Sequence, residues 1–354
     1  MYDRLNPSWE ATAIYRARVR GSLLGGAVGD ALGYPVEFVS LDRIRALHGE
    51  QGVTRLVPDA AGAVGRITND TQMTLFTVEG IRQARVRERQ RGTDDDWSRL
   101  VRDAYGRWFD TQRLSGPPEG AEGLAAQPWL YARRAPGNAC LSGLAQDFVP
   151  DPEAALGRPG RVNSDSKGCG AVMRSAPFGL TRVPADTAFA RAARGAQTTH
   201  GHPTGYYSAG TFAAIVAHLV EGESLEGAVL RALRLLARYL GHEETTSALR
   251  GALDLAAEGA PTAEKVQTLG AGWVGEQALA IAVYCALVEP DVRRALLLSV
   301  NHSGDSDSTG ALCGNLLGAR HGDHGLPQDW LEQIEGRAEI TVVADDLAAE
   351  CTQS

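Results

Sequence analysis

Apolar residues recur every three or four positions along most of this chain, as they do on one face of an α-helix. This spacing is seen over residues 72–91, 206–220, 225–240, 278–288 and 294–300. The alternation of apolar and polar residues that is typical of a strand is approached only over residues 52–57 and 339–343. Both of these stretches are short. The pattern therefore predicts an all-α protein.

Glycine and proline interrupt the helical pattern mainly at residues 115–120 and 149–160, which we interpret as long loops. The motifs described below lie on both sides of these loops, so a domain boundary there would split the site. With 354 residues and 44% hydrophobic side chains, the chain can bury one large core. We predict a single domain over residues 1–354, with a motif-bearing core at about residues 20–322.

The charge balance excludes some classes of partner. The chain has 35 basic and 43 acidic residues, so neither general nucleic-acid binding nor attraction to an anionic membrane is expected. Its five cysteines are widely spaced and form no CxxC pair, which argues against a disulfide framework and a thiolate zinc site. The first residues do not resemble a signal peptide, and the longest uncharged apolar run, 277–288, is too short to span a bilayer. We expect a soluble, cytoplasmic protein without a membrane partner.

Two polar clusters each stand directly before a predicted helix. Residues 301–310, NHSGDSDSTG, contain two carboxylates and several hydroxyls, and residues 68–71, TNDT, precede the helix that begins near Gln72. One interpretation is that both are helix N-caps, since Ser, Thr and Asp satisfy free amide groups there. The alternative is that both face one cleft and share one or two hard cations. Because no Cys or paired His set favours zinc, Mg²⁺ or Mn²⁺ fits best.

Two glycine-rich stretches also have a structural and a functional interpretation. Residues 21–33 predict a tightly packed helix of small residues, which carries Asp30 and leads to Glu37. Residues 166–174 precede another apolar stretch, so their backbone amides could cradle a phosphate at a helix start. No strand precedes this Gly-x-Gly segment, so a Rossmann site is not supported.

Three further side chains invite a functional interpretation. His200 and His202 stand at the start of the helix predicted over residues 206–220. Two histidines at this spacing make a poor metal chelate on a helix, and we favour a polar helix entry over hydrogen bonding to a ligand. Cys169 is a weaker candidate for a nucleophile, because no feature of the sequence supplies its base.

Six segments in this order resemble the ADP-ribosylglycohydrolase family: GSLLGGAVGDALGYPVEF, TNDTQMTLFT, NSDSKGCGAVMRSAPFGL, THGHPTGYYSAG, LGAGWVGEQALAIAVYCAL and NHSGDSDSTGALCGNLLGARHG. The resemblance implies an all-α, compact single-domain orthogonal helical bundle with a dinuclear metal cleft. It implies two Mg²⁺ or Mn²⁺ ions and a hydrolase that removes ADP-ribose from a modified acceptor. That acceptor is expected to be an ADP-ribosylated protein, and the GDALGY stretch favours an arginine-type linkage.

Roles are carried over by position from this resemblance. The implied metal ligands are Thr68, Asn69, Asp70, Asp305, Asp307 and Ser308. The implied ligand-binding residues are Ser166, Lys167, Gly168, Cys169 and Gly170, which would wrap the diphosphate, together with His200 and Trp273. Glu37 and Asp30 are the candidates for acid or base catalysis, and Glu37 falls near the reacting sugar. The bond would break through an oxocarbenium-like state while an activated water attacks.

The chain departs from the family at one metal position. The family's first cluster normally reads Thr-Asp-Asp-Thr, whereas this chain has Asn69 in place of the first aspartate. Asn offers a neutral carbonyl oxygen to a hard cation, so the loss of one carboxylate should weaken the metal site. The chain is then a variant with altered metal use, a ligand-trapping substitution, or a protein that only binds ADP-ribose. The last alternative includes a protein that blocks an ADP-ribosylating toxin or protects its target.

Overall fold

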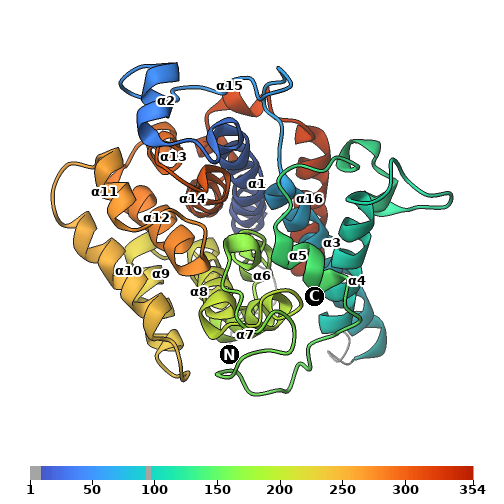
Figure 1. The fold of residues 1–354 in the computed structure, drawn as a ribbon. Coiled ribbons are helices and arrows are strands. Elements are labelled where there is room, and N and C mark those ends of the chain that lie inside the picture. Colours follow the sequence, from blue (N-terminus) through green and yellow to red (C-terminus); the bar gives the residue numbers. More distant parts are fainter. Residues whose placement is uncertain (1–8, 93–96, 354) are drawn as a thin grey trace.

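Helices are the only extended regular elements in the computed structural model, which describes residues 9–92 and 97–353 (Figure 1). The first half contains α1 (Trp9–Gly33), α2 (Leu41–His48), α3 (Asn69–Arg91), α4 (Trp97–Thr111), α5 (Asn138–Leu144), α6 (Ala176–Gly179), α7 (Ala185–Ala196) and α8 (Pro203–Val220). The second half contains α9 (Leu225–Leu236), α10 (Glu243–Ala256), α11 (Ala263–Thr268), α12 (Gly275–Val288), α13 (Val292–Val300), α14 (Ser306–His321), α15 (Gln328–Leu331) and α16 (Arg337–Thr352). The all-α prediction is confirmed.

The helices α1 and α14 form the centre of the molecule, where they pack along most of their lengths (Figure 1). Glycines recur at four-residue spacing on both, at Gly21, Gly25 and Gly29 of α1 and at Gly310 and Gly314 of α14. A Cβ atom at Gly25 would overlap the carbonyl of Gly314, and one at Gly29 would overlap the carbonyl of Gly310. The small-residue stretch is therefore a packing surface, and it lets two backbones approach closely enough to align the start of α14 with the end of α1.

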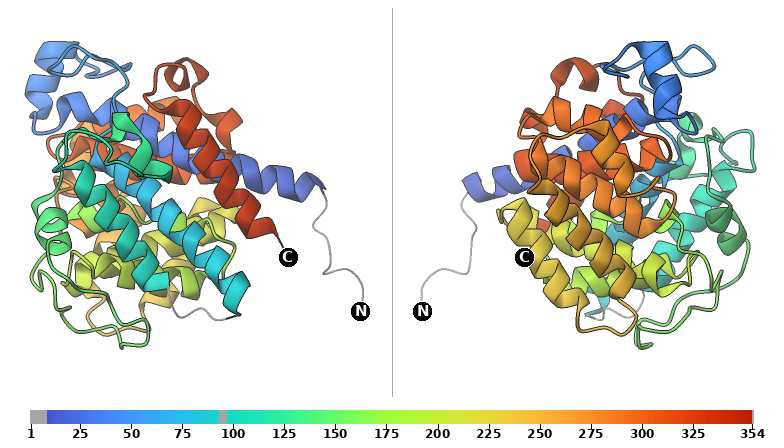
Figure 2. Two further views of the ribbon diagram at one scale, coloured as in Figure 1. Left: turned by 90° about the vertical axis from the view of Figure 1, so that its right-hand side faces the viewer. Right: turned by 60° about the vertical axis from the view of Figure 1, so that its left-hand side comes forward.

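Other helices pack around this pair, while the N-terminal part of α1 projects from the bundle (Figure 2). The helices α3 and α4 pack together on one side, and α8, α10 and α12 pack on the other (Figure 1). The helix α16 contacts both α1 and α3 (Figure 2). Most residues of α8 and α12 are buried, which explains their almost continuous apolar sequences. No helix in the described ranges combines the length and the apolar character needed to cross a membrane.

The two stretches that approached a strand pattern form no strand. Residues 339–343 lie inside α16, whose buried residues include Ile340, Ala344 and Leu347 at helical spacing. This longer period overrides the local run of β-branched residues. Residues 52–57 have no regular structure, and they are held partly by Asn301, whose amide bonds both the N–H and the carbonyl of Val53. The helix predicted over residues 225–240 ends at Leu236.

Candidate active site

A cavity of about 380 Å³ opens where the starts of α3 and α14 face each other. The cavity wall is completed by the loop after the 3₁₀ turn Tyr34–Val36, by residues 133–139, and by the 3₁₀ turn Cys169–Ala171. The residues implied by the resemblance that line it are Glu37, Asn69, Asp70, Gly168, Cys169, Gly170, His200, Trp273, Asp305, Asp307 and Ser308. Those that lie outside its lining are Asp30, Thr68, Ser166 and Lys167. The two polar clusters, far apart in sequence, thus meet at one cavity.

Unpaired carboxylates dominate one wall of this cavity. Glu37, Asp305 and Asp307 each place one carboxylate oxygen within 4.8 Å of the others. Asp70 is 2% exposed, and its Oδ1 has no hydrogen-bond partner among the described residues. Within that part of the chain, none of these four groups forms an ion pair with Lys or Arg. The wall therefore concentrates negative charge that the protein itself does not neutralise.

Burial and mutual repulsion raise the pKa values of these carboxyl groups. For Glu37, burial first and then the charge of Asp307 raise the pKa to about 10. The same two causes raise the pKa of Asp70 and that of Asp305. A divalent cation reverses this preference, because it favours the charged form of every oxygen around it. The donor set consists of hard oxygen atoms, so these residues fit a cation such as Mg²⁺ or Mn²⁺.

The helix-cap interpretation holds for one cluster and fails for the other. Thr68 is the N-cap of α3, and its Oγ1 accepts a hydrogen bond from the backbone N–H of Asp70 at 3.2 Å. Asp305 stands at the N-cap of α14 but makes no side-chain cap hydrogen bond. Instead, its Oδ2 accepts a hydrogen bond from the Cys169 thiol at 2.6 Å. The Asp305 carboxylate is therefore directed at the cavity and not at its own helix.

Asp30, which the resemblance offered as an acid or base, lies behind the cavity and anchors α3. Its buried carboxylate accepts hydrogen bonds from the backbone N–H groups of Thr68 and Thr71, at 2.9 Å and 3.1 Å, and from the Thr71 hydroxyl at 2.5 Å. Burial, followed by the charge of Asp307, raises its pKa to about 7. This placement makes Asp30 a link between α1 and the start of α3, one that positions Asp70 without contacting the cavity.

Asn69 lies at the edge of the cavity and binds the neighbouring loop. The hydrogen-bond network assigns its amide so that Nδ2 donates to the carbonyl of Ala135 at 3.0 Å and to that of Arg134 at 3.2 Å. Its backbone N–H also donates to the carbonyl of Arg134 at 3.2 Å. An aspartate here would place a carboxylate against two carbonyl oxygens. The amide therefore holds the 133–139 wall in a way that a carboxylate cannot.

The segment expected to wrap a diphosphate divides into two parts. Gly168, Cys169 and Gly170 line the cavity, and the N–H of Cys169 is fixed by the carbonyl of Trp273 at 3.1 Å. Lys167 points elsewhere, because its ammonium donates to Glu244 and Glu276, both at 2.7 Å. The side chain of Lys167 thus ties the segment to α10 and α12.

The two histidines have different places. His202 is the N-cap of α8, and its Nδ1 accepts from the backbone N–H of Thr204 at 3.1 Å. His200 is 2% exposed and lines the cavity, with its Nδ1 at 2.7 Å from the Thr199 hydroxyl. The polar helix entry that we favoured therefore describes His202, whereas His200 faces the candidate site.

An aromatic pair stands at the cavity mouth. The rings of Phe38 and Trp273 stack with centroids 4.9 Å apart, and they are 74% and 39% exposed. Phe38 has a φ of 64°, an unusual left-handed conformation for a bulky residue. Sequence reasoning missed Phe38 because a single apolar residue carries no chemical signal. It also missed the 133–139 wall, whose approach depends on the backbone contact with Asn69.

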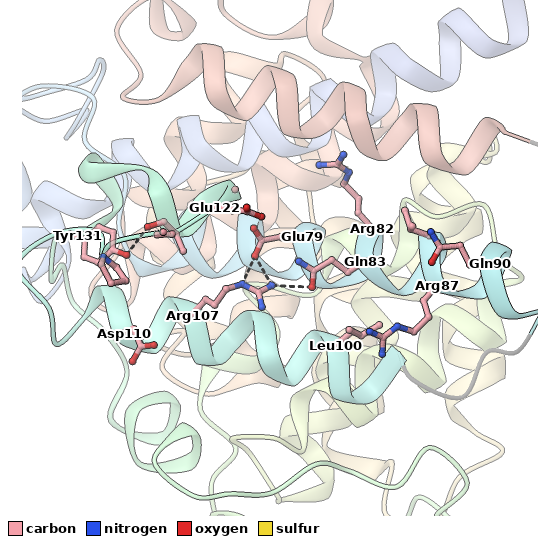
Figure 3. Close-up of a pocket in the computed structure, with 16 residues that line it drawn as sticks. Glu79, Arg82, Gln83, Arg87, Gln90, Leu100, Arg107, Asp110, Glu122 and Tyr131 are labelled. Atoms are coloured by element: carbon pink, nitrogen blue, oxygen red, sulfur yellow. Dashed lines mark hydrogen bonds and ion pairs between the residues drawn. The ribbon is translucent and has the colours of Figure 1, made fainter.

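A second pocket, which we call the outer groove, has a volume of about 800 Å³. It lies on the surface between α3, α4 and the loop around residues 118–125. Figure 3 shows Arg107 of α4 reaching across it to two side chains of α3. The guanidinium donates to Glu79 at 2.8 Å and to Gln83 at 3.1 Å. Arg82 of α3 forms an ion pair with Asp346 at 2.9 Å. This outer groove is larger than the cavity, but its charges are largely paired.

Several known proteins are similar to this chain in sequence. The chain is 27% identical over 332 residues to the ADP-ribosyl-[dinitrogen reductase] glycohydrolase of Rhodospirillum rubrum, covering 91% of this chain and 92% of that protein. It is 30% identical over 253 residues to human ADP-ribosylhydrolase ARH3, covering 57% and 69%. It is 25% identical over 334 residues to the ADP-ribosylarginine hydrolase Tri1 of Serratia proteamaculans, covering 93% and 78%.

Similarity in structure and in family pattern extends over nearly the whole chain. A solved structure described as an ADP-ribosylglycohydrolase-related protein complex superposes with a TM-score of 0.67 at 24% identity, covering 96% of this chain and 100% of that one. That likeness supports the fold. The sequence pattern that defines the ADP-ribosylglycohydrolase family matches residues 11–354. The chain therefore belongs to the ADP-ribosylglycohydrolase family.

Proposed function

We propose that this protein is a metal-dependent hydrolase that cleaves the bond between the anomeric carbon of ADP-ribose and a modified acceptor. The observation that carries the proposal is the group of carboxylates from Glu37, Asp305 and Asp307, which face one another in a cavity without a cationic partner in the described chain. The motifs around them belong to a family named for this activity.

Two Mg²⁺ or Mn²⁺ ions are the proposed cofactors. Asp70, Asp305 and Asp307 would hold them, with oxygen atoms of Asn69 and Ser308 as further ligands, since all five residues line the cavity. When bound, such cations supply Lewis-acid stabilisation of the oxygen atoms of the reacting sugar. Thr68 was also implied as a ligand, and its hydroxyl is already engaged with Asp70.

The protein's own groups have distinct tasks in this proposal. Glu37 is the acid or base, because it is the carboxylate of the cavity that comes from the loop after the 3₁₀ turn Tyr34–Val36 and not from a helix start. Residues 168–170 and the His200 imidazole line the part of the cavity in which the diphosphate would bind. Phe38 and Trp273 cover the entrance and limit the access of bulk water.

The acceptor that we propose is arginine on an ADP-ribosylated protein. The ADP-ribosylarginine hydrolase supports this linkage by name, and the glycohydrolase of dinitrogen reductase is named for a protein acceptor. A protein substrate must bring its modified side chain to the cavity mouth, where Phe38 and Arg133 are exposed. An ADP-ribosylating toxin or its target is a further partner in this proposal.

The test is release of free ADP-ribose from an arginine-ADP-ribosylated protein in the presence of Mg²⁺ or Mn²⁺. A serine-ADP-ribosylated protein assayed in parallel compares the linkages, and a chelator control tests the need for metal. We expect release that the chelator abolishes and that is faster from arginine. Chelator-resistant release would overturn the metal proposal, and release from serine alone would overturn the choice of acceptor.

A second candidate is an ADP-ribose-binding or toxin-blocking protein without turnover, and Asn69 favours it because one metal-binding carboxylate is missing. The Asn69→Asp variant separates the two functions. If the chain is an enzyme adapted to Asn69, the aspartate breaks the bonds to Arg134 and Ala135 and turnover falls or stays unchanged. A large gain in turnover would identify an enzyme weakened at this position, and no release of ADP-ribose by either chain would favour the binder.

A further inference from the structure

A buried arginine lies directly behind the diphosphate-facing wall of the cavity. Arg174 is 1% exposed, and it has no carboxylate partner in the described part of the chain. Its guanidinium lies over the Tyr105 ring at 4.4 Å and donates to the carbonyl of Gly170 at 3.0 Å and to the Thr199 hydroxyl at 2.7 Å. A buried charge without a counterion is costly, so its position calls for a functional reason.

The Thr199 hydroxyl connects Arg174 to His200 through two hydrogen bonds. A guanidinium only donates, so Thr199 Oγ1 accepts from Arg174 and its own proton must go to another atom. The acceptors near it are His200 Nδ1 at 2.7 Å, the carbonyl of Ala196 at 3.4 Å, and the Cys140 sulfur, which already accepts from Arg174 at 3.3 Å. That carbonyl already accepts from the N–H groups of Thr199 and His200, at 3.0 Å and 2.8 Å. The proton therefore points to His200 Nδ1.

This arrangement determines the tautomer of His200. A neutral imidazole that accepts at Nδ1 must carry its proton on Nε2. Nε2 has no hydrogen-bond partner in the described chain, and it faces Gly168 and Gly170, where a Cβ atom would lie 3.4 Å from it. Both glycines line the cavity. The Nε2–H group of His200 therefore faces the segment at which the diphosphate is expected to bind.

We propose that Arg174 and Thr199 are positioning residues that fix His200 as the Nε2–H tautomer, so that a neutral donor in the cavity wall hydrogen-bonds a diphosphate oxygen of the ligand. The choice of ligand rests on the proposed function, whereas the tautomer rests on hydrogen-bond geometry alone. In this arrangement, the buried charge of Arg174 also makes the wall favourable for an anion.

The surroundings of His200 support a neutral ring. Burial, and then the positive charge of Arg174, lower its pKa to about 3. The ring is therefore uncharged near neutral pH, and it donates only through Nε2. Asp70 and Asp305 also line the cavity, and the Asp305 carboxylate accepts a hydrogen bond from the Cys169 thiol.

The first experiment measures the tautomer in the ligand-free protein by ¹⁵N–¹H correlation spectroscopy of the His200 ring. We expect a single Nε2–H form that does not titrate between about pH 5 and pH 8. Thr199→Val removes the hydroxyl and should give mixed tautomers, while Thr199→Ser should keep the wild-type spectrum. An Nδ1–H form in the wild-type protein would overturn the proposal, whatever the variants do.

The second experiment is a double-mutant cycle on ADP-ribose binding, measured by calorimetry. His200→Phe should weaken binding roughly tenfold, as expected for one hydrogen bond to a charged group, and Thr199→Val should weaken it by the smaller factor by which it lowers the population of the Nε2–H form. In a His200→Phe background the same change should have less than about a twofold effect, because Thr199 acts through His200. Equal losses in both backgrounds would overturn the relay. If the wild-type protein binds no ADP-ribose, the diphosphate assignment and the proposed function both fail, even where the tautomer is as expected.

Discussion

Carboxylates line both the outer groove and the cavity, but among the described residues they are paired with arginine in the groove and unpaired in the cavity. In the groove, Glu79 of α3 is matched by Arg107 of α4 (Figure 3), and Arg82 is matched by Asp346 of α16, which lies outside the groove lining. In the cavity, Asp305 and the carboxylates around it face one another with no such match in the described chain. The groove is about twice as large, with about 800 Å³ against about 380 Å³.

Unpaired charge, and not volume, distinguishes a ligand-binding site from a groove between packed helices. A paired charge at a partly exposed surface has already found its partner, and its net effect on stability is small. A group of buried carboxylates without a partner is unfavourable by itself, and it becomes favourable once a cation is bound. The predictions below test this contrast between the two regions.

The largest effect is expected when a cavity carboxylate is removed. Asp307→Ala takes away one of the three oxygens that lie within 4.8 Å of one another. We expect turnover to fall by more than about a hundredfold, because even residues that only support a metal ligand are worth 10- to 100-fold. The measurement is ADP-ribose release together with the thermal shift caused by Mn²⁺. Retained turnover with an unchanged shift would refute the proposed metal site.

A smaller loss is expected when the support behind that wall is weakened. Asp30→Asn keeps the shape of the side chain, but it turns an acceptor that serves Thr68 and Thr71 into a group that also donates. We expect turnover to fall by roughly 10- to 100-fold and the affinity for Mn²⁺ to weaken in parallel. If Asp30 instead transfers a proton to substrate, turnover will fall while the affinity for Mn²⁺ is unchanged.

Much of the fold follows from the periodicity of the sequence, and the exceptions have physical causes. The spacing of apolar residues predicts α3, α8, α12 and α13 to within a few residues. Residues 339–343 were ambiguous because β-branched residues are common in strands, and only the burial of residues on both sides shows a helical period. The pairing of α1 with α14 was not predicted, since it depends on glycines that meet across the whole length of the chain.

The residue types of the site could be predicted from the sequence, whereas the directions in which some of its side chains point could not. The TNDT and GDSDST clusters indicated oxygen ligands, and Asp70 and Asp305 do face one cavity. Whether Asp30 or Lys167 would join them depends on what packs behind each one. Asp30 meets the free amides at the start of α3, and Lys167 meets two glutamates, so both side chains turn away from the cavity. Hydrogen-bond partners that come from distant segments decide such orientations.

The next effect in size is expected in the dependence of stability on pH. In the metal-free protein the pKa of Asp30 is raised to about 7, from an ordinary value of 3.8. Between these values the folded group takes up a proton while the unfolded group remains charged. Acidification from about pH 8 to pH 4 should therefore stabilise the fold through this group, by up to about 1.4 kcal/mol per pH unit in that window.

Calorimetric melting with and without Mn²⁺ is the measurement for this effect. Bound cations favour the charged carboxylates, so the rise in melting temperature on acidification should shrink when Mn²⁺ is present. The Asp30→Asn variant lacks the titrating group and should show a weaker rise than the wild-type protein. A melting temperature that falls steadily as the metal-free protein is acidified from pH 8 would contradict the raised pKa of Asp30.

The smallest effect is expected in the outer groove. Arg107→Ala removes the bonds to Glu79 and Gln83, while Glu79 keeps its hydrogen bond from the backbone N–H of Leu124 at 3.1 Å. Because this pair is partly exposed, we expect a loss of about 1 kcal/mol in the free energy of unfolding and no more than a twofold change in turnover. Chemical denaturation and the ADP-ribose release assay measure the two quantities on one sample. If turnover instead falls tenfold while the affinity for Mn²⁺ is preserved, the groove takes part in binding the modified protein, and paired charge is then no guide to where this protein acts.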